Sequence, residues 1–391
     1  MSAENNPTAP NDGAEVTVSF AATNPCHVYD LAVALRTLGV GGMYYSGYPR
    51  WRLRPPQGFA MRAASFRTLV TYGLQRIPER WRPPNSRLFQ WQDTGFDRRV
   101  AGMLEPADFI HGLPGQCLRI FERARRLGVR TVLNHASGPL RQQLALIAPE
   151  YARAGLASPL REDRSAALLR RIDAEMELAD FHCVASTVVR EQLLREGVAE
   201  DRIWVVPYGA DPARFPKSGR IPAGPFRICF AGQLSIRKGI HYLLKALEAV
   251  GRRDWEACFY GPPMAETEGD FSAYGGAVPL RRMGAVSQAE LGRAFAEASL
   301  LVLPSAEEAF GLVVVQALEA GVPCVVSDRV GAKDLVRHRE NGSVVPFGDV
   351  GALVGELLWW AQNPRRVPDH YGWDPCAAAL KRVSADAAGA V

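Results

Sequence analysis

Short apolar runs alternate with longer segments of helical periodicity along most of the chain. Residues 15–20 alternate like a strand, and the next segment places Val28, Leu31 and Leu35 on one helical face before Gly39. Similar strand-like runs lie at 107–112, 130–137, 181–186, 202–207, 226–232, 256–261, 300–305 and 323–328. Helical segments separate most of these runs, so the pattern predicts an α/β protein built on parallel sheets.

Residues 207–225 interrupt this alternation with a proline- and glycine-rich stretch that has no apolar period. We therefore expect an N-terminal Rossmann-like domain at 14–209, a linker at 210–225 and a C-terminal Rossmann-like domain at 226–365. A helical end is expected at 366–391. The polar residues 1–13 are expected to form a disordered tail, since they lack the basic and apolar regions of a secretory signal.

The composition is that of an ordinary globular protein, with 391 residues, 22% charged and 47% hydrophobic. No apolar run reaches the length of a membrane-spanning helix. The seven cysteines form no C-x-x-C pair, which favours buried free thiols in a reducing cytoplasm. The histidines are scattered and no D-x-D pair occurs, so no metal site is predicted.

An excess of positive charge is concentrated at residues 50–99. This stretch contains 11 arginines and three acidic residues, for a net +8, and eight aromatic residues lie among the arginines. The segment could be a solvated insertion whose aromatic residues form a small core of their own. Alternatively, it binds an anionic membrane surface or a lipid-phosphate-linked acceptor. Single-stranded nucleic acid also suits such a pattern, but nothing else in the chain supports that partner.

The first segment with candidate chemistry is 304–328. Glu308 follows a predicted strand, and Gly311 and Leu312 open a helix whose N-terminus would lie at the carboxyl edge of the sheet. Free backbone N–H groups and the helix dipole favour phosphate there. Glu308 and Gln316 could hold a sugar and a ribose across a diphosphate, or they could be a helix cap and a buried polar residue.

The second segment is 230–247, where Arg237 and Lys238 precede Gly239 at the start of an amphipathic helix. These two cations could neutralise a departing diphosphate, or they could form a solvated basic turn. The chain contains neither G-x-G-x-x-G nor G-x-x-x-x-G-K-[ST], so the dinucleotide-oxidoreductase and P-loop interpretations lose their usual support.

Together these segments resemble the retaining nucleotide-sugar glycosyltransferases of family 4, the glycosyl transferases group 1 with the GT-B fold. "VVPYGADPARF" resembles the family's linker, "GQLSIRKG" its G-R-L-x-x-x-K-G turn, and "EEAFGLVVVQAL" its E-x-F-G-x-x-x-x-E motif. "MGAVS" is similar to its nucleobase loop. The resemblance implies two doubly wound, Rossmann-like domains that face each other across a cleft, with the donor bound by the C-terminal domain.

The resemblance also implies roles for individual residues. Lys238 and Arg237 would contact the diphosphate, and Glu308 would accept hydrogen bonds from hydroxyl groups of the donor sugar. His135 would face the reacting sugar from the N-terminal domain, although a histidine at a strand end can also be structural. The remaining donor contacts would come from Val286 at the base and from the backbone of Phe310, Gly311 and Leu312.

Three departures from the family pattern stand out. Gln316 replaces the second glutamate of the motif and loses charge-assisted strength at the ribose. Gln233 replaces the arginine of the G-R-L turn, which removes one cation from the donor site. "AATNPCH" at 21–27 replaces the Gly-Gly loop, so the contacts of that loop cannot be transferred to this chain.

We therefore expect a metal-independent, retaining glycosyltransferase that moves a sugar from a nucleotide-diphosphate donor to a glycan or lipid-linked acceptor. The expected setting is cell-surface polysaccharide or glycolipid synthesis, in the cytoplasm or on the cytoplasmic face of the membrane. No cofactor besides the donor is expected. A non-catalytic GT-B protein that binds a nucleotide sugar or a partner enzyme is the alternative. A sugar-nucleotide epimerase is less well supported, because its histidine and carboxylate pattern is not evident.

Overall fold

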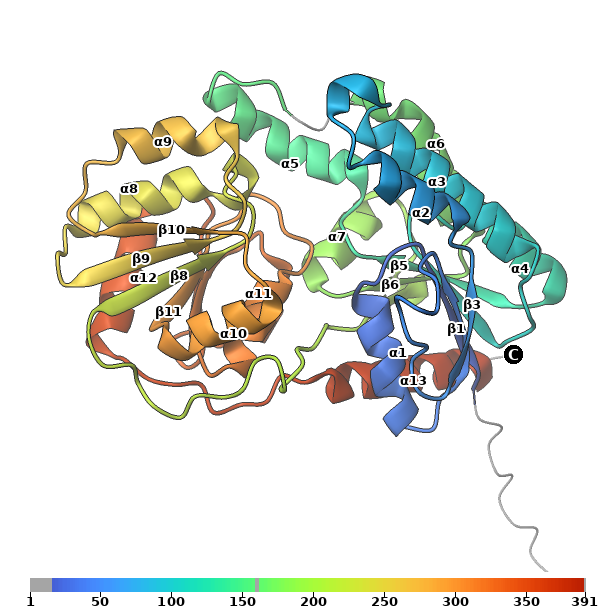
Figure 1. Ribbon diagram of the computed structural model, residues 1–391. Helices are drawn as coiled ribbons and strands as arrows, with labels where there is room; N and C mark the ends of the chain where they lie inside the picture. Colours follow the sequence, from blue (N-terminus) through green and yellow to red (C-terminus); the bar gives the residue numbers. More distant parts are fainter. Residues whose placement is uncertain (1–15, 159–161, 390–391) are drawn as a thin grey trace, which may run out of the picture.

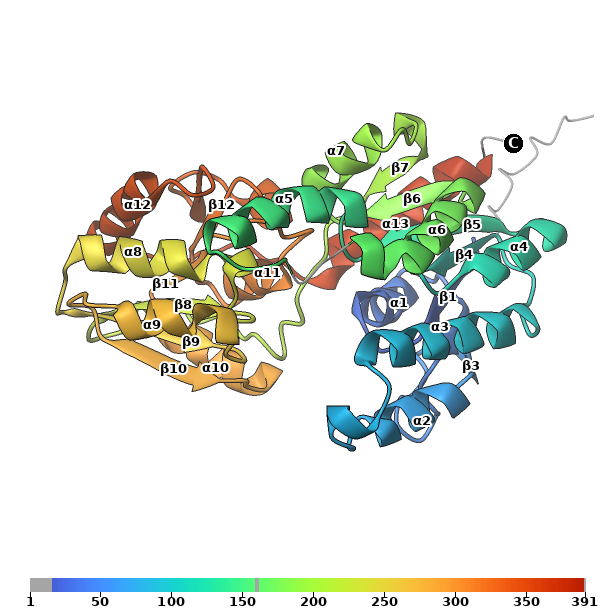
Figure 2. The same ribbon diagram turned by 90° about the horizontal axis from the view of Figure 1, so that it is seen from above.

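The computed structural model describes residues 16–158 and 162–389, so the predicted tail at 1–13 lies outside the described residues. Figures 1 and 2 show two lobes side by side, each with a sheet between helices. Every strand pair within each sheet is parallel. The prediction of an α/β protein with two parallel-sheet domains is confirmed.

The N-terminal sheet has seven strands in the order β3-β2-β1-β4-β5-β6-β7. These strands are β1 (Val18–Ala22), β2 (Gly42–Ser46), β3 (Phe59–Ala63), β4 (Phe109–Gly112), β5 (Arg130–His135), β6 (Phe181–Val184) and β7 (Ile203–Val205). The helices of this lobe are α1 (His27–Thr37), α2 (Phe66–Leu74), α3 (Asn85–Ala101), α4 (Leu118–Leu127), α5 (Leu140–Arg153), α6 (Glu162–Leu178) and α7 (Thr187–Arg195).

The C-terminal sheet has six strands in the order β10-β9-β8-β11-β12-β13. They are β8 (Phe226–Ala231), β9 (Trp255–Tyr260), β10 (Leu280–Gly284), β11 (Leu300–Leu303), β12 (Cys324–Ser327) and β13 (Gly342–Val345). The helices of this lobe are α8 (Ile240–Val250), α9 (Glu268–Ala273), α10 (Gln288–Glu297), α11 (Leu312–Glu319) and α12 (Val350–Gln362), and a short 3₁₀ turn, η3 (Ile236–Lys238), precedes α8. The last helix of the chain is α13 (Trp373–Gly389).

The central strands of both sheets are buried, as parallel strands covered on both faces require, and those of the C-terminal sheet are mostly apolar. In β11 every side chain is buried, and β8 is buried from its third residue onward. These two strands are neighbours, with Leu300 opposite Ile228 and Leu301 opposite Cys229. Their carboxyl ends, and the loops that follow, therefore lie side by side.

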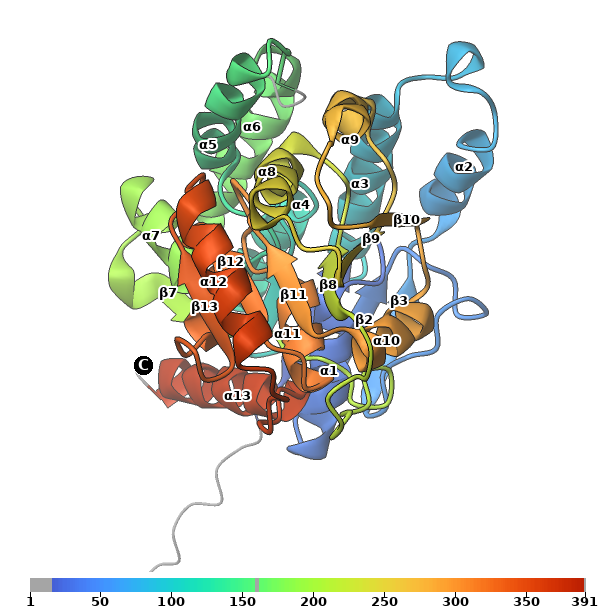
Figure 3. The same cartoon turned by 90° about the vertical axis from the view of Figure 1, so that its left-hand side faces the viewer.

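The arginine-rich segment 50–99 is an integral part of the N-terminal domain. It contributes β3, which pairs with β2, and it continues into α2 and α3. Phe96 on α3 belongs to the domain core, together with Ile110 and Phe121. The interpretation as an insertion with its own small core is therefore wrong, although α2 stands at the outer edge of the domain (Figure 3).

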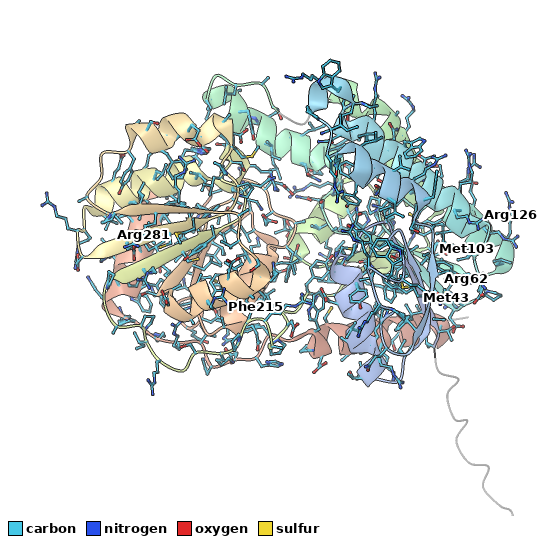
Figure 4. All side chains as sticks on the ribbon, viewed as in Figure 1. Met43, Arg62, Met103, Arg126, Phe215 and Arg281 are labelled. Carbon is cyan, nitrogen blue, oxygen red and sulfur yellow. The ribbon has the colours of Figure 1, made fainter. Side chains whose placement is uncertain are left out.

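The chain crosses twice between the lobes. The first crossing, after β7, is anchored in the C-terminal lobe by Phe215, which is buried with its ring 6.0 Å from that of Phe295 (Figure 4). In the second, α13 returns to the N-terminal lobe and lies against α1 (Figure 1). Cys376, Ala377 and Leu380 of α13 are part of that lobe's core. The last helix thus completes the first domain.

Candidate active site

The two basic residues of the η3 turn each meet a carboxylate of the loop after β11. Lys238 Nζ forms an ion pair with Glu308 Oε2, and both side chains are mostly buried, with exposed fractions of 11% and 17%. Arg237 Nη1 lies 3.0 Å from Glu307 Oε2. The structure therefore brings together two of the three residues expected to be catalytic, with Arg237 beside them.

Two glycines with positive φ permit this close approach. Gly239, at φ 72°, lies directly over the Pro304 carbonyl group, where a Cβ atom would collide with that oxygen. The Ala306 N–H donates to the Arg237 carbonyl oxygen (2.8 Å) and joins the two loops. Gly311, at φ 94°, is the N-cap of α11. Both positions need the left-handed conformation that glycine adopts at little cost.

Burial controls the charge of Lys238. The pKa of its ammonium group is lowered to about 7, mainly by desolvation and also by the positive charge of Arg237, while Glu307 opposes the change. The contact with Glu308 also favours the charged form. An ammonium group whose pKa lies near neutrality, beside a carboxylate, can gain a proton when a polyanion binds.

Three of the seven expected donor-binding residues line a hollow of about 270 Å³ next to this cluster. Gln233, Val286 and Gln316 all face it, and the Gln316 amide donates to Gln288 Oε1 across 3.2 Å. Lys238 is close by, since its Cε would lie 3.9 Å from a Cβ atom at Gly232 in the same wall. The sequence did not single out Gln288, because an exposed first residue of a helix carries no motif.

Phe310 and Leu312 are placed differently from each other. The Phe310 side chain is buried and meets the ring of Tyr208 edge-on at 5.1 Å, so only its backbone is available to a ligand. Leu312 is exposed at the first turn of α11. The helix presents its N-terminus near the Lys238–Glu308 pair, because the Gly311 Cβ position lies 3.3 Å from Glu308 Cγ.

His135 is the last residue of β5 and lines a second hollow, of about 290 Å³, at the carboxyl edge of the N-terminal sheet. Its Nε2 lies 3.1 Å from Nδ1 of His182 on the neighbouring strand. Burial and the adjacent His182 lower the pKa of His135 to about 3, so the imidazole is neutral at ordinary pH.

Four of the seven histidines lie in two buried pairs, His27 with His111 and His135 with His182. His27, His111, His135 and His182 are all buried in the N-terminal domain. Burial lowers the pKa of His27 to about 4 and that of His111 to about 3. The pairing of His135 with His182 follows from the strand order, because β5 and β6 lie side by side.

The N-terminal domain contacts the C-terminal domain at the loop that carries Glu308. Ser186 Oγ, just after β6, donates to the Ala309 carbonyl oxygen at 2.6 Å. Next to it, the Thr187 N–H and hydroxyl group both donate to Asp334, each at 2.6 Å. The carboxyl edge of the N-terminal sheet therefore lies against the E-x-F-G loop of the C-terminal domain.

Helix α5 forms a second bridge, from the N-terminal lobe onto the η3 turn (Figure 2). Tyr151 Oη donates to Glu266 Oε1 (2.5 Å), and the same oxygen accepts the Ile236 N–H (3.0 Å). Tyr242 Oη donates to the buried carboxylate of Glu150 (2.9 Å). Sequence reasoning missed these residues, because an interdomain contact leaves no periodicity in the chain.

Within residues 16–158 and 162–389, no group of three or more His, Cys, Asp and Glu side chains is arranged to hold a metal ion. Among the helices of the same ranges, none is long and apolar enough to cross a bilayer.

This architecture defines the GT-B class: two Rossmann-like domains with a candidate anion site at the carboxyl edge of the second sheet. Residues 212–372 match the family described as glycosyl transferases group 1. The match lies in the C-terminal domain, where the sequence motifs also resemble this family.

Individual relatives agree with this match. The chain is 27% identical over 235 residues to glycogen synthase of Mycobacterium tuberculosis, covering 52% of this chain and 56% of the relative. It is 26% identical over 196 residues to the amylovoran biosynthesis glycosyltransferase AmsK of Erwinia amylovora, covering 46% of each. The chain thus spans about half the length of the curated relatives it matches.

The whole fold matches solved structures. Anabaena HepE in complex with UDP-glucose superposes with a TM-score of 0.59, 14% identity and coverage of 96% of this chain and 95% of HepE. At that identity the likeness shows the GT-B fold of both domains and their arrangement.

The position of Gln316 leads to a first prediction. Its amide is partly exposed in the hollow and is not part of a sealed core. We expect Gln316→Glu to leave the melting temperature within a few degrees, since a carboxylate there remains solvated. If the residue faces the ribose, donor affinity should rise by roughly fivefold through charge-assisted hydrogen bonds. Thermal unfolding and titration with UDP-glucose measure both effects, and a large loss of stability would contradict the assignment.

Proposed function

We propose that this protein is a glycosyltransferase that moves a sugar from a nucleotide-diphosphate donor to a glycan or a lipid-linked acceptor. The observation that carries the proposal is the meeting of Lys238 and Glu308 beside the hollow lined by Val286 and Gln316. The diphosphate and the sugar of a nucleotide-sugar donor are covalently joined. Lys238 would bind the diphosphate, and Glu308 beside it would bind the hydroxyl groups of the sugar.

The chemistry breaks the anomeric C–O bond, and the electron pair leaves with the nucleoside diphosphate. Lys238 and Arg237, together with the N-terminus of α11, would stabilise the negative charge that grows on the departing phosphate oxygen. Glu308 would hold the sugar by accepting hydrogen bonds from its hydroxyl groups. We propose that attack occurs on the same face, with retention of configuration, and that neither a metal ion nor a cofactor besides the donor takes part.

The second hollow would receive the acceptor. It is lined by His135, Gln116 and Gln143 and by the apolar side chains of Leu113, Leu140 and Met176. Because His135 is neutral, it would act as a hydrogen-bonding group and not as a cation. A mixed polar and apolar wall suits a glycan or a glycan linked to a lipid. The proposed place of action is the cytoplasm or the cytoplasmic face of a membrane, with residues 50–99 against an anionic surface.

The relatives support a role in polysaccharide or glycolipid synthesis. One is named a glycogen synthase and another a glycosyltransferase of amylovoran biosynthesis. HepE, whose fold this chain shares, was solved in complex with UDP-glucose. UDP-glucose is therefore the first donor to test, within a panel of UDP-, GDP-, ADP- and TDP-sugars.

The test has two stages. Donors are first ranked by the rise in melting temperature that each produces, and the best donor is then incubated with the protein while free nucleoside diphosphate is measured. We expect slow donor hydrolysis that Glu308→Gln abolishes. Donor binding without any release of nucleoside diphosphate, in the presence of an acceptor extract, would favour the non-catalytic alternative. Absence of binding across the panel would refute the proposal.

A further inference from the structure

Helix α2 exposes apolar residues and buries polar ones. On its outer side Phe66 is 76% exposed and Leu69 is 39% exposed, whereas Thr68 and Thr71 on the inner side are buried. The hydroxyl groups of both threonines lack a hydrogen-bond partner among the described residues, as does the buried amide of Gln92 on α3. A surface helix of a globular protein normally shows the reverse pattern.

The apolar exposure continues beyond α2. Ile77 is 41% exposed and Trp81 is 72% exposed in the turn before α3, and Trp91 on α3 is also exposed. We call residues 66–91 the arginine–aromatic hairpin. Helix α2 packs mainly against α3, and it stands at the outer edge of the domain (Figure 3). Exposed apolar patches of this kind mark binding surfaces.

Positive charge surrounds these apolar side chains. The hairpin contains five arginines and a single acidic residue, Glu79, and its arginines are Arg67, Arg76, Arg80, Arg82 and Arg87. Among the residues whose side chains the structure describes, which excludes Glu79, none of these arginines pairs with a carboxylate. Arg67 and Arg80 instead stack on Trp91 and Trp81.

The acidic residues just beyond the hairpin do not offset this charge, because they point inward. Asp93 accepts a hydrogen bond from Thr23 Oγ1 at 2.9 Å. Asp97 is fully buried and accepts the N–H groups of Arg119 and Ile120, both at 2.9 Å. Asp97 is thus absent from the surface of the segment, and Asp93 is partly buried with its carboxylate engaged.

We propose that the arginine–aromatic hairpin docks on an anionic lipid bilayer and holds the acceptor side of the cleft at the membrane surface. Arginines attract acidic headgroups, while Phe66 and Trp81 enter the boundary between headgroups and acyl chains. Tyr72 Oη donates to Asn24 Oδ1 (3.0 Å), which ties α2 to the loop after β1 at the carboxyl edge of the sheet. The acceptor class is then a lipid-linked molecule.

The statement about the acceptor rests on the proposed function, whereas docking can be measured without any enzymatic assay. The full chain is sedimented with vesicles of phosphatidylcholine alone or of phosphatidylcholine with phosphatidylglycerol, at low and high salt. We expect binding only to the anionic vesicles, and weaker binding at high salt. Failure to bind vesicles would overturn docking and leave glycosyl transfer to be judged by its own assay.

Two variants separate the parts of the surface. Each arginine that is removed should lower the affinity for anionic vesicles by about fivefold. The variant Arg76→Ser/Arg80→Ser/Arg87→Ser should therefore bind them roughly a hundredfold more weakly than the native protein. The control Arg195→Ser/Arg253→Ser/Arg293→Ser removes the same charge from exposed positions elsewhere and should reduce binding far less. Because all six side chains are exposed, the melting temperature should not change.

The apolar contribution has its own matched pair. Phe66→Ser/Trp81→Ser should weaken binding about tenfold or more at every salt concentration. The control Ile221→Ser/Met283→Ser replaces residues that are 53% and 48% exposed in the other lobe and should bind like the native protein. Brominated phosphatidylcholine should quench less tryptophan fluorescence in Trp81→Phe than in the native protein.

Several outcomes would overturn the docking proposal. These are an absence of binding to anionic vesicles at low salt, equal losses in the hairpin and control variants, and quenching that Trp81→Phe leaves unchanged. Capture by single-stranded oligonucleotide in preference to vesicles would assign the surface to nucleic acid. A dimer that Phe66→Ser/Trp81→Ser dissociates would assign it to a second copy of the chain.

Discussion

Replacement of Glu308 by alanine should reduce donor turnover by at least about a hundredfold, which corresponds to about 2.7 kcal/mol of transition-state stabilisation. The carboxylate lies beside the first turn of α11 and forms the ion pair with Lys238. Its loss removes the proposed hydrogen-bond acceptor for the hydroxyl groups of the donor sugar, and it also leaves the Lys238 ammonium group without its ion-pair partner. The measurement is release of nucleoside diphosphate from the best donor of the panel.

The stability of this variant should change much less than its activity. Without Glu308, Lys238 can release its proton, because its pKa is already lowered to about 7, so no obligatory buried charge remains. Glu297→Ala is a suitable control, since that glutamate lies on α10 of the same domain with a side chain 73% exposed. Near-normal turnover in Glu308→Ala would contradict the proposed role.

Donor affinity should depend on pH through Lys238. Below about pH 7 the free protein carries the ammonium group, and above it the proton is lost, so the dissociation constant for UDP-glucose should rise up to about tenfold per pH unit. Lys238→Arg should flatten this rise, because a guanidinium group keeps its charge. Lys238→Met should lower turnover at every pH. Titration calorimetry from pH 6 to about pH 9 measures the effect, and an unchanged profile in Lys238→Arg would contradict it.

The same residue should affect stability in a defined direction. The folded-state pKa of Lys238 is lowered, so between about pH 7 and the ordinary value of 10.5 the unfolded chain binds more protons. The free energy of unfolding should therefore rise with pH across that window, and Lys238→Met should remove this slope. Denaturant unfolding at several pH values provides the measurement. A native slope equal to that of Lys238→Met would mean that the ammonium keeps its ordinary pKa.

The apolar pattern along the chain predicted the boundaries of the helices and strands more accurately in the C-terminal domain than in the N-terminal domain. The amphipathic helix expected to begin after Gly239 is α8, Ile240–Val250, because a clear apolar stripe lies between Gly239 and Gly251, both in the left-handed conformation. The first strand was predicted at 15–20 and is observed at Val18–Ala22. A parallel strand buried on both faces has no alternation to mark its ends, so its boundaries depend on neighbouring strands.

The segment from β2 to α3 was beyond sequence reasoning. Its prolines, arginines and aromatic residues follow neither the helical nor the strand period of apolar positions. Helix α2 exposes apolar residues and buries threonines, so it lacks the buried apolar stripe by which a helix is normally predicted. The composition did indicate a basic, aromatic surface. Only the fold turned Asp93 and Asp97 inward and left the charge of the hairpin unbalanced.

Sequence by itself determined the alternation of strands and helices, the resemblance of the C-terminal domain to the glycosyl transferases group 1, and the residue types suited to a diphosphate and a sugar. Tertiary structure decided which of them meet. Lys238 and Glu308 are seventy residues apart, and they pair because β8 and β11 are neighbours whose carboxyl ends place the following loops side by side. It likewise decided that α13 completes the first domain and that His135 meets His182 on the neighbouring strand. Contacts between distant segments follow from strand order and packing, which no local pattern along the chain encodes.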